Sequence, residues 1–559
     1  MVQRLMKNDF RVAVAQLNPI VGDIEGNFSL AVMAHQKAKE EGANLVLFTE
    51  LFISAYPPED LVLKPAFTKA CEDAVKKLAK LTKGGPGIVI GLPLRHSDNI
   101  YNGVVLLDEG RIVTESLKFD LPNYAEFDEK RVFSSGPRPE PIVYHGLKLG
   151  IVICEDIWND FSLCAELANK GAEIILVLNG SPYHRNKILK RIEVVRAQAL
   201  QSGLSIVYAN QVGGQDELVF DGGSFALNGQ GKMVFQMKHF ENHIALSHWQ
   251  KKTAGWQCVS GPNETLLNGL AADYQACVLG LRDYVNKNRF QNVILGLSGG
   301  IDSALCTTMA VDALGAEKVR TVMMPYHYTS QESLKDAKEC AHLLGCRYEI
   351  IPIVQPVEVF LKTMAPVFLG LPSDVTEENL QSRVRGVILM ALSNKFGSMV
   401  VTTGNKSEMA VGYATLYGDM NGGFNPLKDV YKTQVYALAQ WRNQNHLQNL
   451  KGPEGVVIPP NIIAKVPSAE LRENQKDEDS LPPYPILDDI LQSLIEDDMS
   501  VCDIIKRGYL RETVEKIEHL LYGAEYKRRQ SAPGVKISYK NFGRDRRYPI
   551  VNRFRNNKN

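Results

Sequence analysis

Six residues at 298–303, Ser-Gly-Gly-Ile-Asp-Ser, are of the types that bind a phosphate group. They follow an apolar run, Val293–Leu297, which is typical of a buried strand, and they precede a helical pattern over Ala304–Leu314. In such a strand–turn–helix layout several backbone N–H groups point at one anion, and paired glycines let the backbone approach it closely. Asp302 adds a carboxylate of the kind that holds Mg²⁺. The string predicts a phosphate site; the plainer interpretation is a tight turn without a ligand.

Three polar residues in the first half of the chain, Glu50, Lys118 and Cys154, lie at or just after strand-like runs. Strand ends place side chains at the rim of a sheet, where the sites of α/β proteins are usually found. A cysteine nucleophile needs a base to remove its proton and a cation near the developing negative charge. The three residues together supply these roles and predict covalent catalysis. Taken singly, they are better explained as a solvated carboxylate, a surface charge and a small core side chain.

The patterns around these residues predict an α/β protein with two domains. A chain of 559 residues is too long for one ordinary core. In both halves strand-like runs alternate with helical patterns, and the repeated strand–helix units of the second half favour a parallel sheet with ligands at its carboxyl edge. Residues 256–263 become small and polar, which predicts a linker between a domain at 1–255 and a domain at 264–559.

Composition narrows the class of protein. The net charge is zero, which argues against a nucleic-acid binder. The nine cysteines are scattered without a C-x-x-C pair, so a disulfide framework or a zinc ribbon is not expected. The N-terminus has no signal-peptide pattern, and no run of about 18 apolar residues predicts a membrane span. We therefore expect a cytoplasmic protein without a membrane or nucleic-acid partner.

The strings that contain Glu50, Lys118 and Cys154 resemble those of the nitrilase superfamily, whose sites carry a Glu–Lys–Cys triad. The strings are LFTEL at 47–51, KFDLPNY at 118–124 and ICEDIW at 153–158. The resemblance covers about residues 8–255 and implies an αββα sandwich that hydrolyses an amide through a thioester. It makes Glu50 the general base, Lys118 the oxyanion stabiliser and Cys154 the nucleophile.

Within that superfamily the string LPNYAEFDEKR at 121–131 resembles the glutaminase domain of glutamine-dependent NAD synthetases. The resemblance implies that the residues in contact with glutamine are Tyr124, Glu129, Ser181 and Lys187. Two glutamates of the string, Glu126 and Glu129, are candidates for an additional carboxylate, and the pattern favours Glu129. The basic residues on the following helical pattern, Lys187 apart, are expected to form a solvated face: Arg185, Lys190, Arg191 and Arg196.

Strings in the second half resemble the synthetase domain of NAD synthetases over about residues 265–540. The strings are SGGIDS at 298–303, TGNKSE at 403–408 and GDMNGGFNPLKDVYK at 418–432. The first also resembles the pyrophosphate loop of the ATP pyrophosphatases, which split ATP into AMP and pyrophosphate to activate a carboxylate or carbonyl oxygen. This implies a doubly wound parallel sheet of the adenine nucleotide alpha hydrolase-like kind.

The same resemblance implies the ligands of the second site. The ATP-binding residues would be Gly296, Leu297, Ser298, Gly299, Gly300, Ile301, Asp302, Ser303, Thr403, Lys428 and Ser468. The residues that bind deamido-NAD would be Asn379, Glu408 and Lys527, and Mg²⁺ would be held by Asp302 and Glu408. The acidic, proline-flanked residues 467–483 predict an exposed loop and resemble the family's substrate-covering segment.

The C-terminal residues 526–559 contain eleven Lys or Arg and one acid. The plainer interpretation of this charge is a solvated tail or a nucleic-acid patch, but YKRRQ at 526–530 resembles the closing motif of the synthetase family. That motif implies contacts with substrate phosphates or carboxylates.

The resemblances together imply a glutamine-dependent NAD synthetase. It would hydrolyse glutamine and use ATP to amidate deamido-NAD to NAD, as a homo-oligomer with small-molecule partners only. Free ammonia is largely protonated at neutral pH, so a tunnel between the two sites is a further hypothesis. The alternatives are another amidotransferase of the ATP pyrophosphatase type, such as a GMP or asparagine synthetase, and a nitrilase-like scaffold without catalysis. The glutaminases of those two synthetases resemble other types, and intact Cys154 and Asp302 argue against a scaffold.

Overall fold

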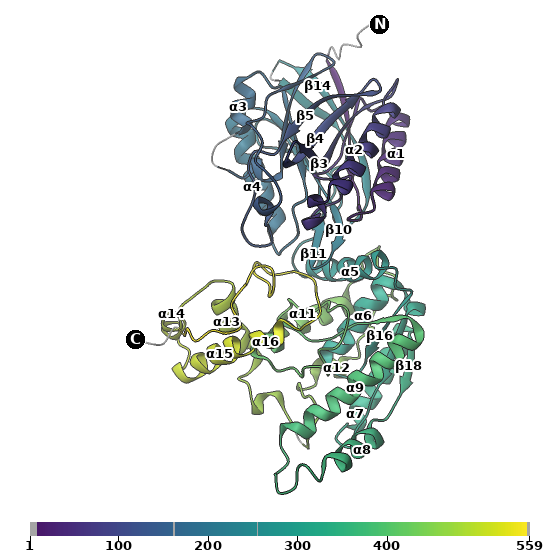
Figure 1. Cartoon of the computed structure of the whole chain (residues 1–559), viewed down its shortest axis with the longest axis vertical. Helices are drawn as coiled ribbons and strands as arrows, with labels where there is room; N and C mark the ends of the chain where they lie inside the picture. The colour runs from purple at the N-terminus through teal and green to yellow at the C-terminus, as the bar shows by residue number, and fades with distance from the viewer. Residues whose placement is uncertain (1–7, 160–162, 254, 474, 556–559) are drawn as a thin grey trace. The chain divides into compact units, whose positions relative to one another are not determined.

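The computed structural model describes residues 8–159, 163–253, 255–473 and 475–555. The chain divides into two compact units (Figure 1). The first comprises Met1–Gln215 and Val219–Asn268, and the second comprises Asp216–Leu218 and Gly269–Asn559. Over the described ranges, no helix combines the length and the apolar character needed to cross a membrane.

Two β-sheets form the centre of the first unit, and helices cover their outer faces. In the described residues, the seven-stranded sheet has the order β15 (Gly255–Ser260), β14 (His243–Lys252), β1 (Asp9–Gln16), β2 (Leu45–Leu47), β3 (Gly87–His96), β4 (Asn99–Asp108), β5 (Arg111–Leu117). The six-stranded sheet, counted likewise, has the order β13 (Met233–Gln236), β12 (Phe225–Leu227), β9 (Ser205–Asn210), β8 (Ile174–Asn179), β7 (Leu147–Ile153), β6 (Ile142–Tyr144). Helices α1 (Ile24–Glu40) and α2 (Pro65–Leu81) pack on the first sheet, and α3 (Leu163–Asn169) and α4 (Lys187–Ser202) pack on the second.

The alternation of side chains along the strands explains these layers. Successive residues of a strand face opposite sides of the sheet. In β1, Val12 and Val14 belong to the core between the two sheets, whereas Ala13 and Ala15 belong to the core beneath α1 and α2. Because the strand is apolar on both faces, it requires cover on both. The αββα sandwich predicted from the sequence is confirmed.

The boundary between the units corrects the linker predicted at 256–263. Residues Gly255–Ser260 form β15, which pairs antiparallel with β14. Trp256 is buried in the core between the sheets, while most other residues of this edge strand are exposed. The small and polar composition therefore marks an edge strand, and the boundary between the two compact units lies at 268/269. The turn between β10 (Val212–Gln215) and β11 (Leu218–Asp221), together with the first residue of β11, counts with the second unit.

A parallel sheet, four-stranded over the described residues, forms the centre of the second unit. Its order is β18 (Arg347–Ile350), β17 (Val319–Met323), β16 (Asn292–Gly296), β19 (Ser398–Val400). The helices that precede or connect these strands are α5 (Gly269–Lys287), α6 (Ile301–Leu314), α7 (Gln331–Leu344), α8 (Val354–Met364) and α9 (Val375–Phe396). Strands β16 and β19 are neighbours although three other connections separate them in the chain, so the strand order reverses between them. This confirms the doubly wound sheet and places its switch point, where ligands bind in such folds, at the ends of β16 and β19.

Shorter helices form a second layer of this unit. They are α10 (Lys406–Val411), α11 (Lys432–Gln444), α12 (Pro460–Ala464), α13 (Tyr484–Ile495), α14 (Val501–Lys506), α15 (Arg511–Gly523) and α16 (Glu525–Arg528). Helices α10, α13, α14 and α15 share one apolar core. The basic C-terminal segment packs on this unit, because Arg528 and Arg546 are buried and both pair with Glu525, at 2.7 and 2.8 Å. Over this stretch the expectation of a solvated tail is wrong.

Candidate active sites

The first unit buries a lysine between two glutamates. Lys118 Nζ donates to Glu50 Oε1 at 2.7 Å and to both carboxylate oxygens of Glu129 at 2.9 Å. Lys118 and Glu50 are completely buried, and Glu129 is nearly so. Burial opposes the charged lysine, but the two carboxylates outweigh it and raise the pKa of Lys118 well above its usual value. Burial also raises the pKa of Glu129, to about 6, against the effect of Lys118.

Both glutamates are held by further hydrogen bonds. Glu50 lies three residues beyond the end of β2; its Oε1 accepts from Asn102 Nδ2 at 2.7 Å and its Oε2 from the Gly180 N–H at 2.8 Å. Tyr56 donates its hydroxyl to Glu129 Oε1 at 2.9 Å. Each carboxylate therefore has a fixed orientation toward Lys118, and Glu129 rather than Glu126 is the additional carboxylate in this cluster.

Cys154 follows β7 directly and is 3% exposed. Its φ angle of 44° lies in the left-handed region, where a residue with a side chain costs of order 1–3 kcal/mol, and such strain is concentrated at functional sites. Burial, and then the charge of Glu50, raises the pKa of the thiol well above its usual value, while Lys118 acts to lower it. The resting thiol therefore keeps its proton and needs a base to become a nucleophile.

The Asp156 carboxylate connects the backbone just after Lys118 with the backbone just before Cys154. Its Oδ1 accepts the backbone N–H groups of Phe119 and Asp120, at 3.1 and 2.7 Å, and its Oδ2 accepts the Ile153 N–H at 3.1 Å. These residues flank Lys118 and Cys154, so one buried carboxylate fixes both backbones. Burial raises the pKa of Asp156 to about 7, against the effect of the backbone hydrogen bonds.

The residues assigned to glutamine lie around the same turn. Tyr124 donates its hydroxyl to Glu155, the residue after Cys154, at 2.9 Å. Lys187 Nζ lies 4.5 Å from the centre of the Trp158 ring, at the end of the 3₁₀ turn that begins with Cys154. Ser181 follows β8, the parallel neighbour of β7, and is 2% exposed. The structure thus brings the predicted residues of the first site to one edge of the sandwich.

One residue of the basic run corrects the sequence analysis. Arg191 is completely buried and pairs with Asp221 at 2.7 Å, whereas Lys190 and Arg196 are exposed as predicted. The sequence gives no signal for this burial, because the partner lies 30 residues further along the chain.

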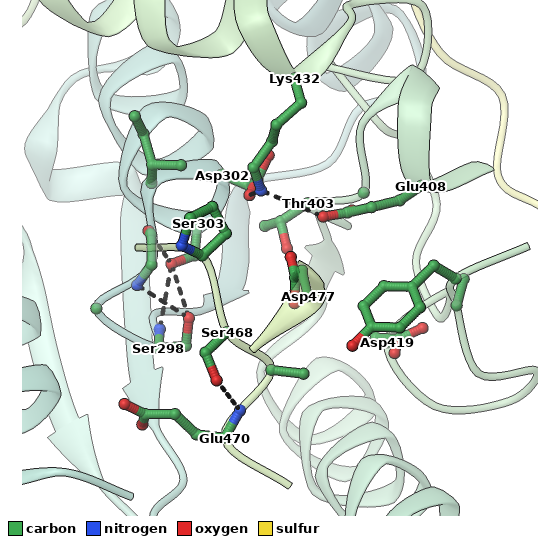
Figure 2. A pocket seen from close by; sticks show the side chains of 18 of the residues that line it. Ser298, Asp302, Ser303, Thr403, Glu408, Asp419, Lys432, Ser468, Glu470 and Asp477 are labelled. Carbon is green, nitrogen blue, oxygen red and sulfur yellow. Dashed lines mark hydrogen bonds and ion pairs between the residues drawn. The ribbon is translucent and has the colours of Figure 1, made fainter. Parts of the chain in front are cut away.

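In the second unit the predicted phosphate loop lines a pocket at the switch point of the sheet (Figure 2). Ser298 and Ser303 close the loop on itself: Ser303 Oγ accepts the Ser298 N–H, and Ser298 Oγ accepts the Gly300 N–H, both at 3.2 Å. Gly299 has a φ of 82°, and a Cβ there would lie 2.5 Å from the Ser333 carbonyl oxygen. Only glycine meets both requirements.

Helix α6 begins at this loop with its first turn open to the pocket. Its N-cap residue, Gly300, makes no side-chain cap, and Ile301, Asp302 and Ser303 all line the pocket. The uncapped N–H groups of a 14-residue helix attract an anion. The helix starts three residues earlier than the pattern from Ala304 indicates, so the second half of the SGGIDS string, Ile301–Ser303, is helical rather than loop.

A lysine that the sequence analysis did not single out lies between the two predicted metal ligands (Figure 2). Lys432 Nζ contacts Asp302 Oδ2 and lies 3.3 Å from Glu408 Oε1. Burial opposes its charge, but Asp302 and then Glu408 raise the pKa of Lys432 above its usual value. Burial raises the pKa of Glu408 to about 8, against the effect of Lys432. Lys432 is the first residue of α11. In the sequence, the only indication of its role was its place at the end of the string 418–432, which also contains Lys428.

The carboxylates around Lys432 suit a hard cation. Asp302 and Glu408 direct oxygens at one ammonium group, and Mg²⁺ prefers oxygen ligands. Asn405 holds both carboxylates in place. Its side-chain Nδ2–H donates to Asp302 Oδ1 at 2.8 Å, and its backbone N–H donates to Glu408 Oε2 at 3.3 Å. Within the described ranges, no group of three or more His, Cys, Asp or Glu side chains is arranged to hold a metal.

The acidic segment predicted as an exposed loop lies across this pocket. Ser468, Glu470 and Asp477 line it, and Asp477 is 4% exposed. Glu470 accepts the hydroxyls of Ser330 and Ser333 at the start of α7, at 2.9 and 2.8 Å. The expectation of an exposed loop is therefore wrong for the side chains that face the pocket.

The other predicted residues of the second site fall in two groups. Thr403 lines the same pocket, and Gly296 and Leu297 line a neighbouring pocket that shares Ser298 and Thr403 with it. By contrast, three are not among the described lining residues of either pocket: Asn379, Lys428 and Lys527. Asn379 accepts from Thr415, Lys428 donates to the Ala532 carbonyl, and Lys527 donates to the carbonyls of Gly412 and Ala414.

Family comparisons match each unit separately. A carbon-nitrogen hydrolase family model matches residues 11–256, and an NAD synthase family model matches residues 273–531. The chain thus joins a carbon-nitrogen hydrolase unit, with its buried Glu–Lys–Cys arrangement, to an NAD synthase unit, with its phosphate loop.

Full-length relatives define the family. The chain is 48% identical over 550 residues to the glutamine-dependent NAD(+) synthetase of Rhodobacter capsulatus, covering 98% of this chain and 100% of that protein. It is 45% identical to the synthetase of the same name from Acinetobacter baylyi, over 98% of this chain and 99% of that protein. The solved structure of the glutamine-dependent NAD+ synthetase from Acinetobacter baumannii in complex with ADP is 43% identical, with a TM-score of 0.78 over 97% of this chain and 99% of that one. The chain belongs to the glutamine-dependent NAD(+) synthetase family, as the resemblances indicated.

Proposed function

We propose that this chain makes NAD⁺ from deamido-NAD, ATP and L-glutamine, with glutamate, AMP and pyrophosphate as the other products. The observation that carries the proposal is the Glu50–Lys118–Glu129 cluster beside Cys154, in a chain whose second unit lines a pocket with the SGGIDS loop. The relative from Acinetobacter baumannii holds ADP, which supports an adenine nucleotide substrate. A GMP or asparagine synthetase is disfavoured, because the first unit is of the carbon-nitrogen hydrolase family.

In the first unit, Cys154 Sγ attacks the side-chain amide carbon of glutamine. Glu50 removes the thiol proton and returns it to the leaving nitrogen, so that neutral ammonia departs and a thioester remains. Lys118 stabilises the negative charge that develops in this step while its own charge stays fixed by the two carboxylates. Water, deprotonated by Glu50, then hydrolyses the thioester to glutamate. Tyr124, Ser181 and Lys187 bind the remainder of glutamine.

In the second unit, a carboxylate oxygen of the nicotinate ring attacks the α-phosphorus of ATP, and pyrophosphate leaves. The backbone N–H groups at the start of α6 bind the phosphates, and Lys432 balances their charge. Ammonia then attacks the activated carbonyl carbon, AMP leaves, and one proton is released. Asp302 and Glu408 would hold Mg²⁺, which neutralises phosphate charge when bound. Thr403 and Ser468 complete the ATP site, and deamido-NAD binding by Asn379, Glu408 and Lys527 stays a prediction, as do a homo-oligomer and a cytoplasmic location.

The test compares two nitrogen donors in three proteins. Wild type should form AMP and NAD⁺ in equal amounts from deamido-NAD and ATP with either glutamine or ammonium. Cys154→Ala should lose the reaction with glutamine and retain the reaction with ammonium. Asp302→Asn should lose both while still releasing glutamate from glutamine. Loss of the ammonium reaction in Cys154→Ala would refute this division between the units.

A further inference from the structure

The turn after β8 is held by a buried ion pair for which the mechanism above has no use. Arg191, on α4, and Asp221, at the end of β11, are both completely buried. Arg191 Nη1 donates to both carboxylate oxygens of Asp221, at 2.7 and 2.9 Å. Desolvation offsets much of the attraction in such a pair, so its presence is weak support for a role in stability alone. The remaining donors of the guanidinium indicate what the pair does.

Those donors all hold one turn. Arg191 Nε donates to Ser181 Oγ at 3.0 Å, and Nη2 donates to the carbonyls of Ser181 and Pro182, both at 2.8 Å. Asn210 Oδ1 accepts the Ser181 N–H at 3.0 Å. The hydroxyl oxygen and both backbone polar groups of Ser181 therefore have fixed partners. Since the bonds from Arg191 are charge-assisted, the turn is held more firmly than neutral hydrogen bonds would hold it.

The same turn contacts the Glu50 carboxylate directly and is linked to the Glu129 carboxylate through Tyr56. The Gly180 N–H donates to Glu50 Oε2 at 2.8 Å. A Cβ on Gly180 would lie 2.9 Å from the Tyr56 ring, so the backbone packs against the ring whose hydroxyl donates to Glu129. A shift of the turn therefore moves Glu50 and Glu129 relative to Cys154.

We propose that Arg191, with Asp221 as its counter-charge, is a positioning residue for the glutaminase reaction. It acts through the Ser181 turn, which holds the Gly180 N–H against Glu50 and so keeps Glu50 placed to remove the Cys154 proton. The inference deepens the proposed function and rests on it. A base displaced by about 1 Å loses about 100-fold in rate, so a loosened turn is expected to have a large effect.

The test uses Arg191→Lys in the full-length chain. Lysine keeps the charge opposite Asp221, but its single ammonium group cannot reach Asp221 and the acceptors of the turn together. Arg196→Lys is the matched control, because Arg196 is on the same helix and is exposed, with Nε donating to the Gly231 carbonyl at 3.1 Å. The readouts are glutamate release and the rate at which iodoacetamide alkylates Cys154 between about pH 6 and about pH 9, a range that brackets the ordinary thiol pKa. Iodoacetamide has no amino-acid part, so its rate reports the base and the nucleophile rather than glutamine binding.

Arg191→Lys should lower glutamate release and the alkylation rate about 10- to 100-fold, with NAD⁺ synthesis from ammonium unchanged. Arg196→Lys should match wild type in all three. A folded Arg191→Lys with wild-type alkylation would overturn the inference. The fluorescence of the buried Trp249 and Trp256 shows whether the first unit has folded.

If Arg191→Lys does not fold, the Asp221→Asn variant tests the positioning role instead, because it leaves the hydrogen bonds from Arg191 to the Ser181 turn in place. Alkylation within about threefold of wild type, with a lower free energy of unfolding, supports the positioning role. A loss of 10-fold or more refutes it, since the counter-charge and not the turn would then control Cys154. A wild type that releases no glutamate refutes the proposed function, whereas the alkylation rates still decide the role of Arg191.

Discussion

Lys432 offers the sharpest test of the second site, because it is the buried cation between Asp302 and Glu408. In Lys432→Met both carboxylates lose this partner, and Met fills a similar volume without charge. Removing one member of a buried ion pair costs about 3–5 kcal/mol. When this cost appears in full in the activation free energy, at about 1.4 kcal/mol for each factor of ten in rate, adenylation falls about 100- to 4,000-fold. The triphosphate also loses a positive charge, which acts in the same direction.

The assay is exchange of labelled pyrophosphate into ATP, which requires deamido-NAD but no ammonia and so isolates adenylation. Lys428→Met is the comparison, because the Lys428 ammonium donates to the Ala532 carbonyl at 2.7 Å. It loses one hydrogen bond, worth about 1 kcal/mol, so its exchange rate should fall less than tenfold. Near-normal exchange in Lys432→Met, or a larger loss in Lys428→Met, would refute this reading of the pocket and restore Lys428 as the phosphate lysine.

Three further predictions concern the first unit. Tyr56→Phe removes the hydrogen bond to Glu129. It should lower glutamate release about 5- to 10-fold, equivalent to about 1 kcal/mol, and leave the ammonium reaction unchanged. An unchanged rate of glutamate release would show that Tyr56 does not support Glu129 in catalysis. Asp156→Asn leaves at least one of three buried N–H groups unpaired. It should lower the free energy of unfolding, measured in urea, by about 1–3 kcal/mol. A change below about 0.5 kcal/mol would contradict the proposal that Asp156 holds the two backbone segments together. Burial lowers the pKa of His35, His239 and His243, so each contributes stability above the unfolded value of 6.5 that is lost as the pH falls through the folded pKa. Urea unfolding followed by tryptophan fluorescence should show the first unit weakening from about pH 7.5 to about pH 5.5, and a flat profile would contradict the burial of these rings as neutral groups.

Periodicity and strand ends predicted much of the fold. The apolar run Val293–Leu297, predicted as a strand, corresponds to β16, which ends one residue earlier, and the helical pattern over Ala304–Leu314 ends with α6 at Leu314. Edge strands were harder, because their side chains are mostly exposed and lack the apolar signal: β15 was taken for a linker. Pairing between strands distant in the chain, such as β1 with β14, is not encoded in any local pattern.

The site residues divide in the same way, into those that a local sequence pattern indicates and those that it does not. Glu50, Lys118 and Cys154 carry strings specific enough to be found, and the structure brings Lys118 onto Glu50 across 68 positions of sequence. Arg191 and Lys432 were missed, because a basic residue on a helix looks the same whether it is solvated or buried. Their roles depend on acidic partners that only folding brings near, 30 positions away for Arg191 and 130 for Lys432.

The fate of the glutamine nitrogen tests the central proposal most directly. Wild type is supplied with deamido-NAD, ATP, Mg²⁺ and glutamine labelled with ¹⁵N in its side-chain amide, without added ammonium. We predict NAD⁺ labelled with ¹⁵N in its carboxamide, formed in equal amounts with AMP and glutamate. Unlabelled product, release of ADP in place of AMP, or glutamate formed without NAD⁺ would contradict the proposal that one chain couples the two reactions.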